Sequence, residues 1–405
     1  MNGIEVIPRE HYLEKLRGLK DFPIIKGLTG IRRCGKSTLM TEFIEELKAS
    51  GIPRDRILYI NLDDEMSGIE TWRDLLNHIT GVVGDPKDSY LFLDEIQNIP
   101  EWERVVSTLF LKGADIYITG SNSQMLSTEL STKLSGRCIE IRVQPLAFRE
   151  YLLFRKESGK DTAATLLDDY IRRGGFPAVA LLEDTMPGLV PDMLMGIYNT
   201  VYTKDVSERN SIRNNELVSN VCRFVMKNIG DRTSIRSVSN YLTSKGTKTR
   251  PETVDSYISM LEKARLIGRA KRMDLKTKEY LRTSEKFYAA DLGLRNIIVP
   301  YSETDLDGML ENIVFNELIF RYGRASVCSV GDLEIDFVAD SEGTPSYYQV
   351  CMNIGDASTR ERELRPLRSV KDNYPKTIIT YDRFPFKDIE GIRIISLLEW
   401  LTESR

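Results

Sequence analysis

The sequence predicts a doubly wound α/β fold in its N-terminal third, followed by a helical segment and a second, mixed α/β half. Three observations support this. Short apolar runs alternate with helical patterns up to about residue 145, a Gly-Gly turn interrupts a helical stretch near residue 174, and mixed patterns return over the last hundred residues. The chain has 405 residues, which at roughly 100–200 residues per domain gives two to four domains.

Composition narrows the class of protein further. Hydrophobic residues make up 41%, charged residues 29%, and the net charge is −4, which excludes a mostly disordered chain. No apolar run approaches the roughly 20 residues of a membrane span, and the N-terminus lacks a signal pattern, so we expect a cytoplasmic protein with no membrane partner. Five scattered cysteines and two histidines, His11 and His78, argue against a disulfide framework, a zinc site or histidine-based catalysis. Any catalysis would then rest on carboxylates, Lys, Arg, hydroxyls or a bound metal ion.

The N-terminal strands are predicted from apolar runs of four or five residues, the length and composition of strands in a parallel sheet. The last of the five alternates with Glu140 and Arg142, which suits a strand with one wet face. The segments between the runs are long enough for crossover helices. The runs cover residues 24–28, 57–60, 90–93, 116–119 and 139–143.

A phosphate-binding loop follows the first strand. Residues 30–37, Gly-Ile-Arg-Arg-Cys-Gly-Lys-Ser, match GxxxxGK[ST] in full and open a predicted helix over 36–48, which is the context that a P-loop (Walker A motif) requires. Backbone N–H groups and the helix N-terminus would hold the phosphates of ATP, Lys36 would reach the outer ones, and Ser37 would ligate Mg²⁺. The predicted nucleotide contacts are Gly30, Arg33, Cys34, Gly35, Lys36, Ser37 and Thr38.

A second acidic motif follows the third strand. Residues 90–95, Tyr-Leu-Phe-Leu-Asp-Glu, are typical of a Walker B motif. Asp94 would hold Mg²⁺, and Glu95 would orient and polarise the attacking water. A solvent-exposed acidic pair at a strand end is the alternative, which the P-loop upstream disfavours.

Two further residues are candidates for transition-state contacts. Asn122, with Ser121 as second choice, follows the fourth strand and would contact the γ-phosphate or the water; a capped turn is the alternative. Arg137 lies between a predicted helix over 124–134 and the fifth strand, where AAA-type ATPases project an arginine finger into a neighbouring subunit. A helix-end arginine that interacts with the helix dipole is the competing interpretation.

These motifs together resemble a prokaryotic AAA-type P-loop ATPase family, and three later segments carry the same resemblance: residues 145–151, 174–177 and 287–295. The resemblance implies an ATPase domain over 1–145 and a helical lid over 146–206. A winged-helix domain would follow over 207–300, and a restriction-endonuclease-like domain of unknown function over 301–405.

Residues 207–300 carry nineteen Lys and Arg against ten Asp and Glu, so this segment is basic in an acidic chain. Helices over 216–229, 235–244 and 251–264 and strands over 266–273 and 280–288 predict a winged helix. Its basic residues would suit a DNA backbone, and a protein-packing module is the alternative. The predicted DNA contacts are Arg250, Lys271, Arg272, Lys276 and Lys278, in a wider cluster with Lys245, Lys248 and Arg269.

The C-terminal segment predicts a helix over 308–322, strands over 326–330, 333–339 and 347–351, a helix over 360–374 and a strand over 377–381. A nuclease of the resembled fold needs paired acids and a lysine around Mg²⁺. Asp336, Gln349 and the helix residue Glu317 could supply oxygen ligands, but Cys351 stands at the lysine position. Lys371 is the nearest replacement in sequence. Nuclease activity is therefore not expected.

The sequence thus predicts an Mg²⁺-dependent ATP hydrolase, homo-oligomeric, that couples its nucleotide state to DNA or to a DNA-bound partner. Two alternatives stay open: an ATP-gated signalling switch with slow hydrolysis, and an ATP-regulated nuclease. The sequence identifies neither a protein partner nor the preferred DNA.

Overall fold

The computed structural model describes residues 6–64, 66, 68–121, 136–155, 162–210, 212, 214–277, 279–341 and 343–403. The chain divides into two compact units. The first contains the residues up to Gln144 together with Lys263–Arg265, and the second contains Pro145–Glu262 and the residues from Leu266 onward.

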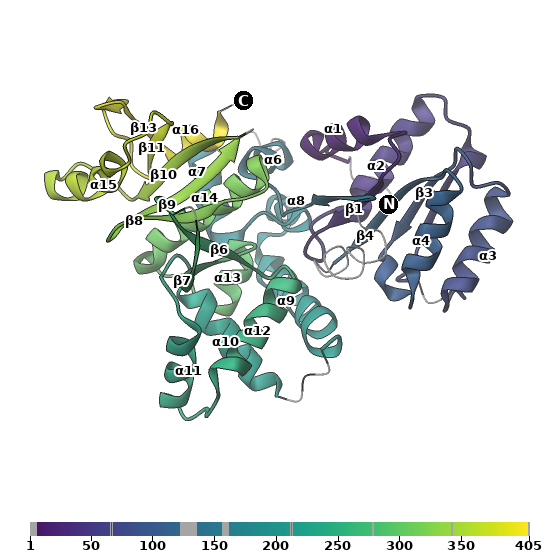
Figure 1. Cartoon of the computed structure of the whole chain (residues 1–405), viewed down its shortest axis with the longest axis horizontal. Helices are drawn as coiled ribbons and strands as arrows, with labels where there is room; N and C mark the ends of the chain where they lie inside the picture. Colours follow the sequence, from purple (N-terminus) through teal and green to yellow (C-terminus); the bar gives the residue numbers. More distant parts are fainter. Residues whose placement is uncertain are drawn as a thin grey trace. The chain divides into compact units, whose positions relative to one another are not determined.

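The first unit is built on a parallel sheet of five strands in the order β2-β3-β4-β1-β5. Figure 1 labels three of these strands, β1, β3 and β4. Every strand lies within one residue of its predicted bounds, which confirms the α/β class with a parallel sheet. The strands are β1 (Ile25–Thr29), β2 (Ile57–Asn61), β3 (Tyr90–Asp94), β4 (Asp115–Gly120) and β5 (Cys138–Arg142).

Helices cover both faces of this sheet. Alternate strand residues such as Leu91 and Ile118 pack with Val105 in one apolar core. The rings of Phe92 and Tyr117 stack at 4.6 Å between centroids on the other face, where Phe43 contacts both. This two-sided burial explains why β1, β3 and β4 have such apolar sequences. The helices are α1 (Glu10–Leu19), α2 (Lys36–Ala49), α3 (Trp72–Val83) and α4 (Trp102–Leu111). The helix predicted over 124–134 lies outside the described residues.

The second unit begins with helices α6 (Phe148–Phe154), α7 (Ala163–Arg173), α8 (Pro177–Thr185) and α9 (Val190–Thr200), and α9 continues into a π-helix (Val201–Glu208). The predicted turn after α7 requires glycine. Gly174 has φ +77°, and a Cβ there would lie 2.1 Å from Oδ1 of Asp291. Asp291 accepts a 2.7 Å hydrogen bond from the Gly175 N–H and caps α13 (Leu292–Ile298), so it ties the turn to that helix.

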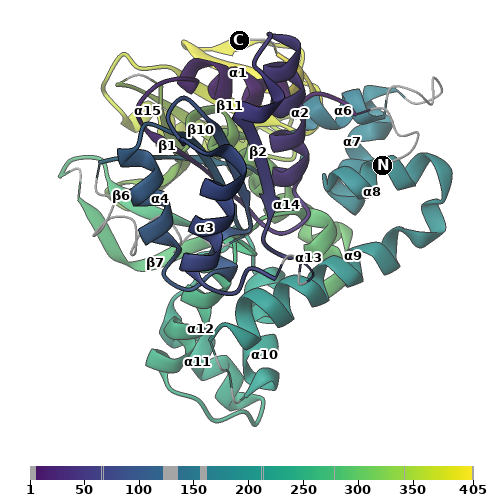
Figure 2. The ribbon, with the colours of Figure 1, turned by 90° about the vertical axis from the view of Figure 1, so that its right-hand side faces the viewer.

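The predicted three helices and hairpin occur in order as α10 (Asn215–Lys227), α11 (Ile235–Ser244), α12 (Pro251–Lys263), β6 (Ile267–Asp274) and β7 (Tyr280–Ala289). In both views of the ribbon the three helices lie together, away from strands β10 and β11 of the same unit (Figures 1 and 2). The hairpin does not form a separate wing: β6 also pairs in parallel with β8.

The hairpin therefore belongs to one eight-stranded sheet, ordered β12-β13-β11-β10-β9-β8-β6-β7. The predicted division at 300/301 cuts through this sheet, because two of its strands precede that point and six follow it. The later strands are β8 (Ser326–Val330), β9 (Leu333–Ser341), β10 (Thr344–Cys351), β11 (Lys376–Thr380), β12 (Asp388–Ile389) and β13 (Ile392–Ser396).

Helices α14 (Leu306–Tyr322), α15 (Ala357–Ser369) and α16 (Leu397–Thr402) pack on the second unit's sheet. The prediction of a helix over 360–374 was wrong at both ends. Asp356 caps α15 by accepting hydrogen bonds from the N–H groups of Ser358 and Thr359, and the backbone becomes extended at Val370. The strands β12 and β13 and the helix α16 were not predicted. Across the described part of the chain, no helix has the length and apolar character needed to cross a membrane.

Candidate functional site

The loop of residues 30–36 leads from β1 into α2 and passes close to the backbone of Val143. A Cβ on Gly30 would lie 2.1 Å from the carbonyl oxygen of Val143, so only glycine fits there. Gly35 has φ +101°, a conformation that favours glycine, and it precedes the first turn of α2. Ser37 and Thr38 are exposed in that turn. The loop thus offers N–H donors and hydroxyls at a helix N-terminus, as an anion site requires.

The ammonium of Lys36 lies inside this loop. Its Nζ donates to the carbonyl oxygens of Gly30 (2.9 Å) and Ile31 (3.2 Å), and it lies 3.9 Å from Oε1 of Glu95. Arg33 is exposed on the loop with φ +69°. Lys36 and Arg33 therefore differ in position: Lys36 is held within the loop, and Arg33 extends into solvent.

Cys34, predicted as a nucleotide contact, turns its side chain into the protein. The thiol is buried and donates to the carbonyl oxygen of Val143 at 3.4 Å, and burial raises its pKa. Arg9 donates to the carbonyl oxygens of Cys34 (2.9 Å) and Gln144 (3.0 Å). The side chain of Cys34 thus anchors the loop, and its backbone is the part available to phosphate.

Asp94, at the carboxyl end of β3, is fixed by hydroxyl groups from both neighbouring strands. Tyr59 of β2 donates to Oδ2 at 2.8 Å, and Thr119 of β4 donates to Oδ1. The Thr119 oxygen also accepts a 2.8 Å hydrogen bond from the N–H of Glu95. The roles of Tyr59 and Thr119 were not predicted from the sequence. Their hydroxyl groups near the ends of two predicted strands were the sequence feature that could have indicated them.

Glu95 has a left-handed backbone conformation (φ +54°) and is 9% exposed, so its carboxylate is placed almost entirely by protein contacts. Gln97 donates to Oε2 through its side-chain amide. Arg32 lies 4.0 Å from the same oxygen, and Lys36 lies 3.9 Å from Oε1. The structure therefore places Lys36, Gln97 and Arg32 around Glu95 and links Glu95 to Asp94 through Thr119.

The three candidates for transition-state contacts, Asn122, Ser121 and Arg137, differ in their surroundings. Asn122 lies outside the described residues, and Ser121 is buried at the end of β4. Arg137 is exposed immediately before β5, with its guanidinium carbon 5.8 Å from the centroid of Phe110. Its carbonyl oxygen accepts a 2.8 Å hydrogen bond from the N–H of Ile25. The Arg137 side chain thus lies on the surface of the first unit.

The donor set fits a magnesium nucleotide. The Gly30 position leaves no room for a side chain, the Lys36 ammonium faces the loop, and a carboxylate and a hydroxyl, from Asp94 and Ser37, are the hard oxygen ligands that Mg²⁺ prefers.

The predicted DNA contacts differ in their exposure to solvent. Arg250, Lys271 and Lys276 are exposed, Arg272 is half-buried, and Lys278 lies outside the described residues. Arg269, expected to extend this basic cluster, is instead paired with Glu262 at 2.7 Å and Glu285 at 2.9 Å, also lies 4.0 Å from Asp255, and so is neutralised. Glu262 and Asp255 both lie on α12, so the exposed predicted contacts lie beside this helix: Arg250 directly before it, Lys271 in β6 and Lys276 in the turn after β6.

The predicted C-terminal constellation is partly assembled. The N–H of Asp336 donates to Gln349 at 3.4 Å, and Cys351 is buried, where burial raises its pKa. Glu317 was expected as the helix ligand, but it pairs with Arg321 at 2.6 Å. The carboxylate of α14 in the Asp336 cluster is Glu311, and the lysine beside Asp336 is Lys286 of β7 rather than Lys371.

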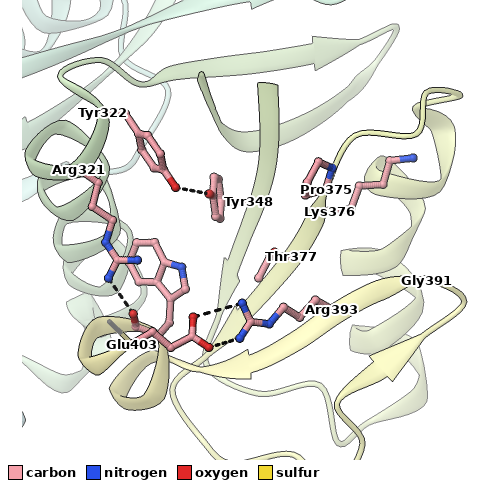
Figure 3. Close-up of a pocket in the computed structure, with 10 residues that line it drawn as sticks. Arg321, Tyr322, Tyr348, Pro375, Lys376, Thr377, Gly391, Arg393 and Glu403 are labelled. Carbon is pink, nitrogen blue, oxygen red and sulfur yellow. Dashed lines mark hydrogen bonds and ion pairs between the residues drawn. The ribbon is translucent and has the colours of Figure 1, made fainter. Parts of the chain in front are cut away.

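A pocket of about 350 Å³ lies elsewhere in the second unit (Figure 3). Its charged groups already hold one another or the backbone: Arg393 pairs with Glu403, and Arg321 donates to the carbonyl oxygen of Trp400 at 2.8 Å. Lys376 donates to two carbonyl oxygens. These pairings leave the pocket without a group that identifies a ligand.

The parallel sheet, the loop of residues 30–36 and the acidic end of β3 define a P-loop ATPase of the AAA class. Residues 23–152 match the AAA domain family, and residues 164–305 match a domain of unknown function. A Walker-type ATPase of Pyrococcus abyssi shares the fold with a TM-score of 0.51 at 16% identity, over 72% of this chain and 96% of that chain.

Two relatives match over nearly the full length. An uncharacterized protein of Haemophilus influenzae is 33% identical over 402 residues, covering 98% of this chain and 99% of the relative. An uncharacterized protein of Methanocaldococcus jannaschii is 30% identical over 414 residues, covering 96% and 89%. The chain belongs to the family that these relatives represent, and its own residues 23–152 match the AAA domain.

Proposed function

We propose that the protein is an Mg²⁺-dependent ATP hydrolase whose site is formed by the P-loop and the acidic end of β3. The observation that carries the proposal is the position of the Lys36 ammonium, inside the loop and 3.9 Å from the carboxylate of Glu95. A cation that faces the phosphate space, next to a carboxylate that can act on water, is the pair that phosphoryl transfer requires.

Each residue has a distinct role in this proposal. Lys36 exchanges the carbonyl oxygens of Gly30 and Ile31 for the outer phosphates of ATP. Ser37 and Asp94 hold Mg²⁺, which supplies charge neutralisation on the phosphates. Glu95 accepts a hydrogen bond from the attacking water and polarises it, because its carboxylate is fixed by Gln97 and stays close to the loop.

Substitutions in these two motifs test the proposal. Lys36→Ala should weaken ATP binding. Glu95→Gln should retain binding and lower turnover by about 10²–10⁴-fold, since the amide cannot accept the proton. Glu101→Gln, which changes an exposed glutamate paired with Arg104, is the matched control and should be silent. The measurements are equilibrium binding of a fluorescent ATP analogue and release of phosphate.

The outcome also separates hydrolysis from the switch alternative. Turnover that is unchanged in Glu95→Gln would refute the assigned role. Hydrolysis by the wild-type protein that is slower than the dissociation of ATP, so that most bound ATP leaves unchanged, would instead favour a nucleotide-gated switch.

A second proposal is that the ATPase is coupled to DNA through the exposed basic residues beside α12, as a winged helix would be. It is favoured by the exposure of Arg250, Lys271 and Lys276, and opposed by the acids of α12. The contacts would therefore be to the phosphate backbone, because lysine and arginine contacts to phosphate do not read sequence.

A third proposal is a homo-oligomer in which Arg137 acts on the ATP site of a neighbouring chain. It is supported by the exposure of Arg137 on the surface of the first unit. Recovery of hydrolysis when Arg137→Ala and Glu95→Gln chains are mixed would support it, since one interface would then have both intact residues. No recovery in verified mixed oligomers would oppose it.

A further inference from the structure

Three carboxylates of the second unit converge on one lysine. The Nζ of Lys286 lies 3.0 Å from Oε2 of Glu311, 3.2 Å from Oε1 of Glu334 and 3.2 Å from Oδ1 of Asp336. The side chains of Lys286 and Asp336 are only 6% and 8% exposed. We call Lys286, Glu311, Glu334 and Asp336 the lysine cluster.

The elements that carry the cluster explain why it forms. Lys286 and Tyr288 are two residues apart in β7 and share a face, and Glu311 and Phe315 are one helical turn apart in α14. The rings of Tyr288 and Phe315 stack at 4.5 Å between centroids, and the Tyr288 hydroxyl donates to Glu311 at 2.9 Å. This packing places Lys286 opposite Glu311 and against Asp336 of β9.

The surrounding polar groups form further hydrogen bonds and ion pairs with the carboxylates of the lysine cluster. Oδ2 of Asp336 accepts a 2.9 Å hydrogen bond from the N–H of Val350, and Arg232 pairs with Glu334 at 2.5 Å. Farther out, Gln349 donates to Glu363 at 3.0 Å, and Glu363 pairs with Arg362. Each carboxylate of the network therefore has a cationic or N–H partner.

Electrostatics favours a charged lysine at this position. Burial alone would lower the pKa of Lys286, but the charges of Asp336, Glu311 and Glu334 outweigh burial and raise it above its usual range. Burial also raises the pKa of Glu311, with the charge of Asp336 adding to the effect. Without the ammonium, the buried carboxylate of Asp336 and the half-buried carboxylates of Glu311 and Glu334 would repel one another, which is costly in a poorly solvated site.

We infer that Lys286 is the resident cation of the C-terminal carboxylate cluster and occupies the place that a divalent metal ion would need. A magnesium ion lies about 2.0–2.1 Å from its oxygen ligands, so an ion bound to Glu311 and Asp336 would lie almost on the ammonium. Among the described residues, no group of three or more His, Cys, Asp or Glu side chains is arranged to hold a metal ion.

This inference gives the lysine cluster a definite role. The hairpin β6–β7 closes the carboxylate site with its own lysine, and the charges that a nuclease would use to bind a metal instead hold β7, α14 and β9 together. A lysine beside Asp336 is otherwise what a nuclease of this fold requires, so the argument against the ATP-regulated nuclease rests on the exclusion of the metal ion by Lys286.

Manganese binding to the full-length chain tests the inference. Mn²⁺ binding is titrated by electron paramagnetic resonance without nucleotide. The wild-type protein and Asp336→Asn should bind the same amount of Mn²⁺, because the native cluster holds none. Lys286→Met should gain one Mn²⁺ per chain, and the double variant with Asp336→Asn should lose it. Lys376→Met is the matched control, because this lysine of the same sheet donates only to carbonyl oxygens, and it should gain no ion.

Two results would overturn the inference. One is a wild-type site for Mn²⁺ that disappears in Asp336→Asn, which would mean that the metal and Lys286 coexist. The other is a folded Lys286→Met protein, verified by circular dichroism, that gains no ion. If Lys286→Met does not fold, the comparison between wild type and Asp336→Asn still decides whether the native cluster excludes the metal.

Discussion

At the residue scale, the two acids of the Walker B motif are held by side chains that lie outside this motif. Tyr59 and Thr119 fix the two oxygens of Asp94, and Gln97 fixes Glu95. The free energy of each contact is modest, about 1–3 kcal/mol for a hydrogen bond to a charged group. In the proposed mechanism its effect on catalysis is larger, because the orientation of Glu95 decides whether the attacking water is aligned with the γ-phosphate.

Gln97→Ala should lower kcat about tenfold and leave KM for ATP nearly unchanged, because it frees the Glu95 carboxylate without touching the phosphate loop. Asn98→Ala is the control, since Asn98 lies in the same short turn but donates to the carbonyl oxygen of Leu62 at 3.1 Å. Steady-state phosphate release gives both constants. An equal loss of kcat in the two variants would assign the effect to the turn rather than to Glu95.

The sequence predicted the residues of this site that lie in contiguous motifs and missed those that act across strands. Lys36 and Glu95 each follow a strand within one local pattern. Tyr59 and Thr119 reach Asp94 only because β2 and β4 flank β3, and strand order is a property of the folded sheet. Lys286 was missed for the same reason, since it lies fifty positions from Asp336 in the chain.

At the element scale, local sequence determined which segments form helices and strands, and distant pairing determined how they group. The hairpin β6–β7 was predicted nearly to the residue. Its partner β8 was predicted too, but not the parallel pairing of Arg272 with Val327 that joins them. The sequence of a hairpin does not show whether the outer edge of its first strand is free or paired with another strand. The pairing of β6 with β8, and with it the position of the domain boundary, could therefore not be deduced.

The Gly174 turn gives a prediction at this scale. Gly174→Ala should lower the free energy of unfolding by about 1–3 kcal/mol, because φ is +77° and the added Cβ would meet Oδ1 of Asp291 at 2.1 Å. Gly196→Ala should raise it by up to about 1 kcal/mol, since Gly196 lies in α9 with no atom within 4 Å of the added Cβ. Urea denaturation followed by circular dichroism distinguishes the two. Equal changes in the free energy of unfolding of the two variants would contradict the requirement for glycine at position 174.

At the scale of the whole molecule, the chain combines an ATPase unit with a larger unit that carries both the exposed basic residues beside α12 and the lysine cluster. Acidic and basic residues nearly balance overall, yet residues 207–300 are basic. A basic segment in an acidic chain favours a localised electrostatic contact, whose strength depends on salt.

If this segment binds DNA, affinity should fall by about 10³–10⁵ between 50 and 200 mM salt when about six or more phosphates are neutralised. Replacing Arg250, Lys271 and Lys276 by Ala should flatten the salt dependence. The control replaces three exposed basic residues elsewhere in the same unit, Lys371, Arg383 and Lys387. Fluorescence anisotropy with labelled duplex and single-stranded DNA gives the slopes. Equal slopes for the two triple variants would place the contact elsewhere or remove it.

The parallel pairing of β6 with β8 also bears on how the chain is made. During synthesis the hairpin β6–β7 leaves the ribosome before α14 and β8 exist, so one edge of β6 stays unpaired until that strand arrives. The C-terminal half therefore cannot complete its fold piece by piece. A messenger truncated between the hairpin and β8 would yield a product with an open strand edge, which is a template for aggregation.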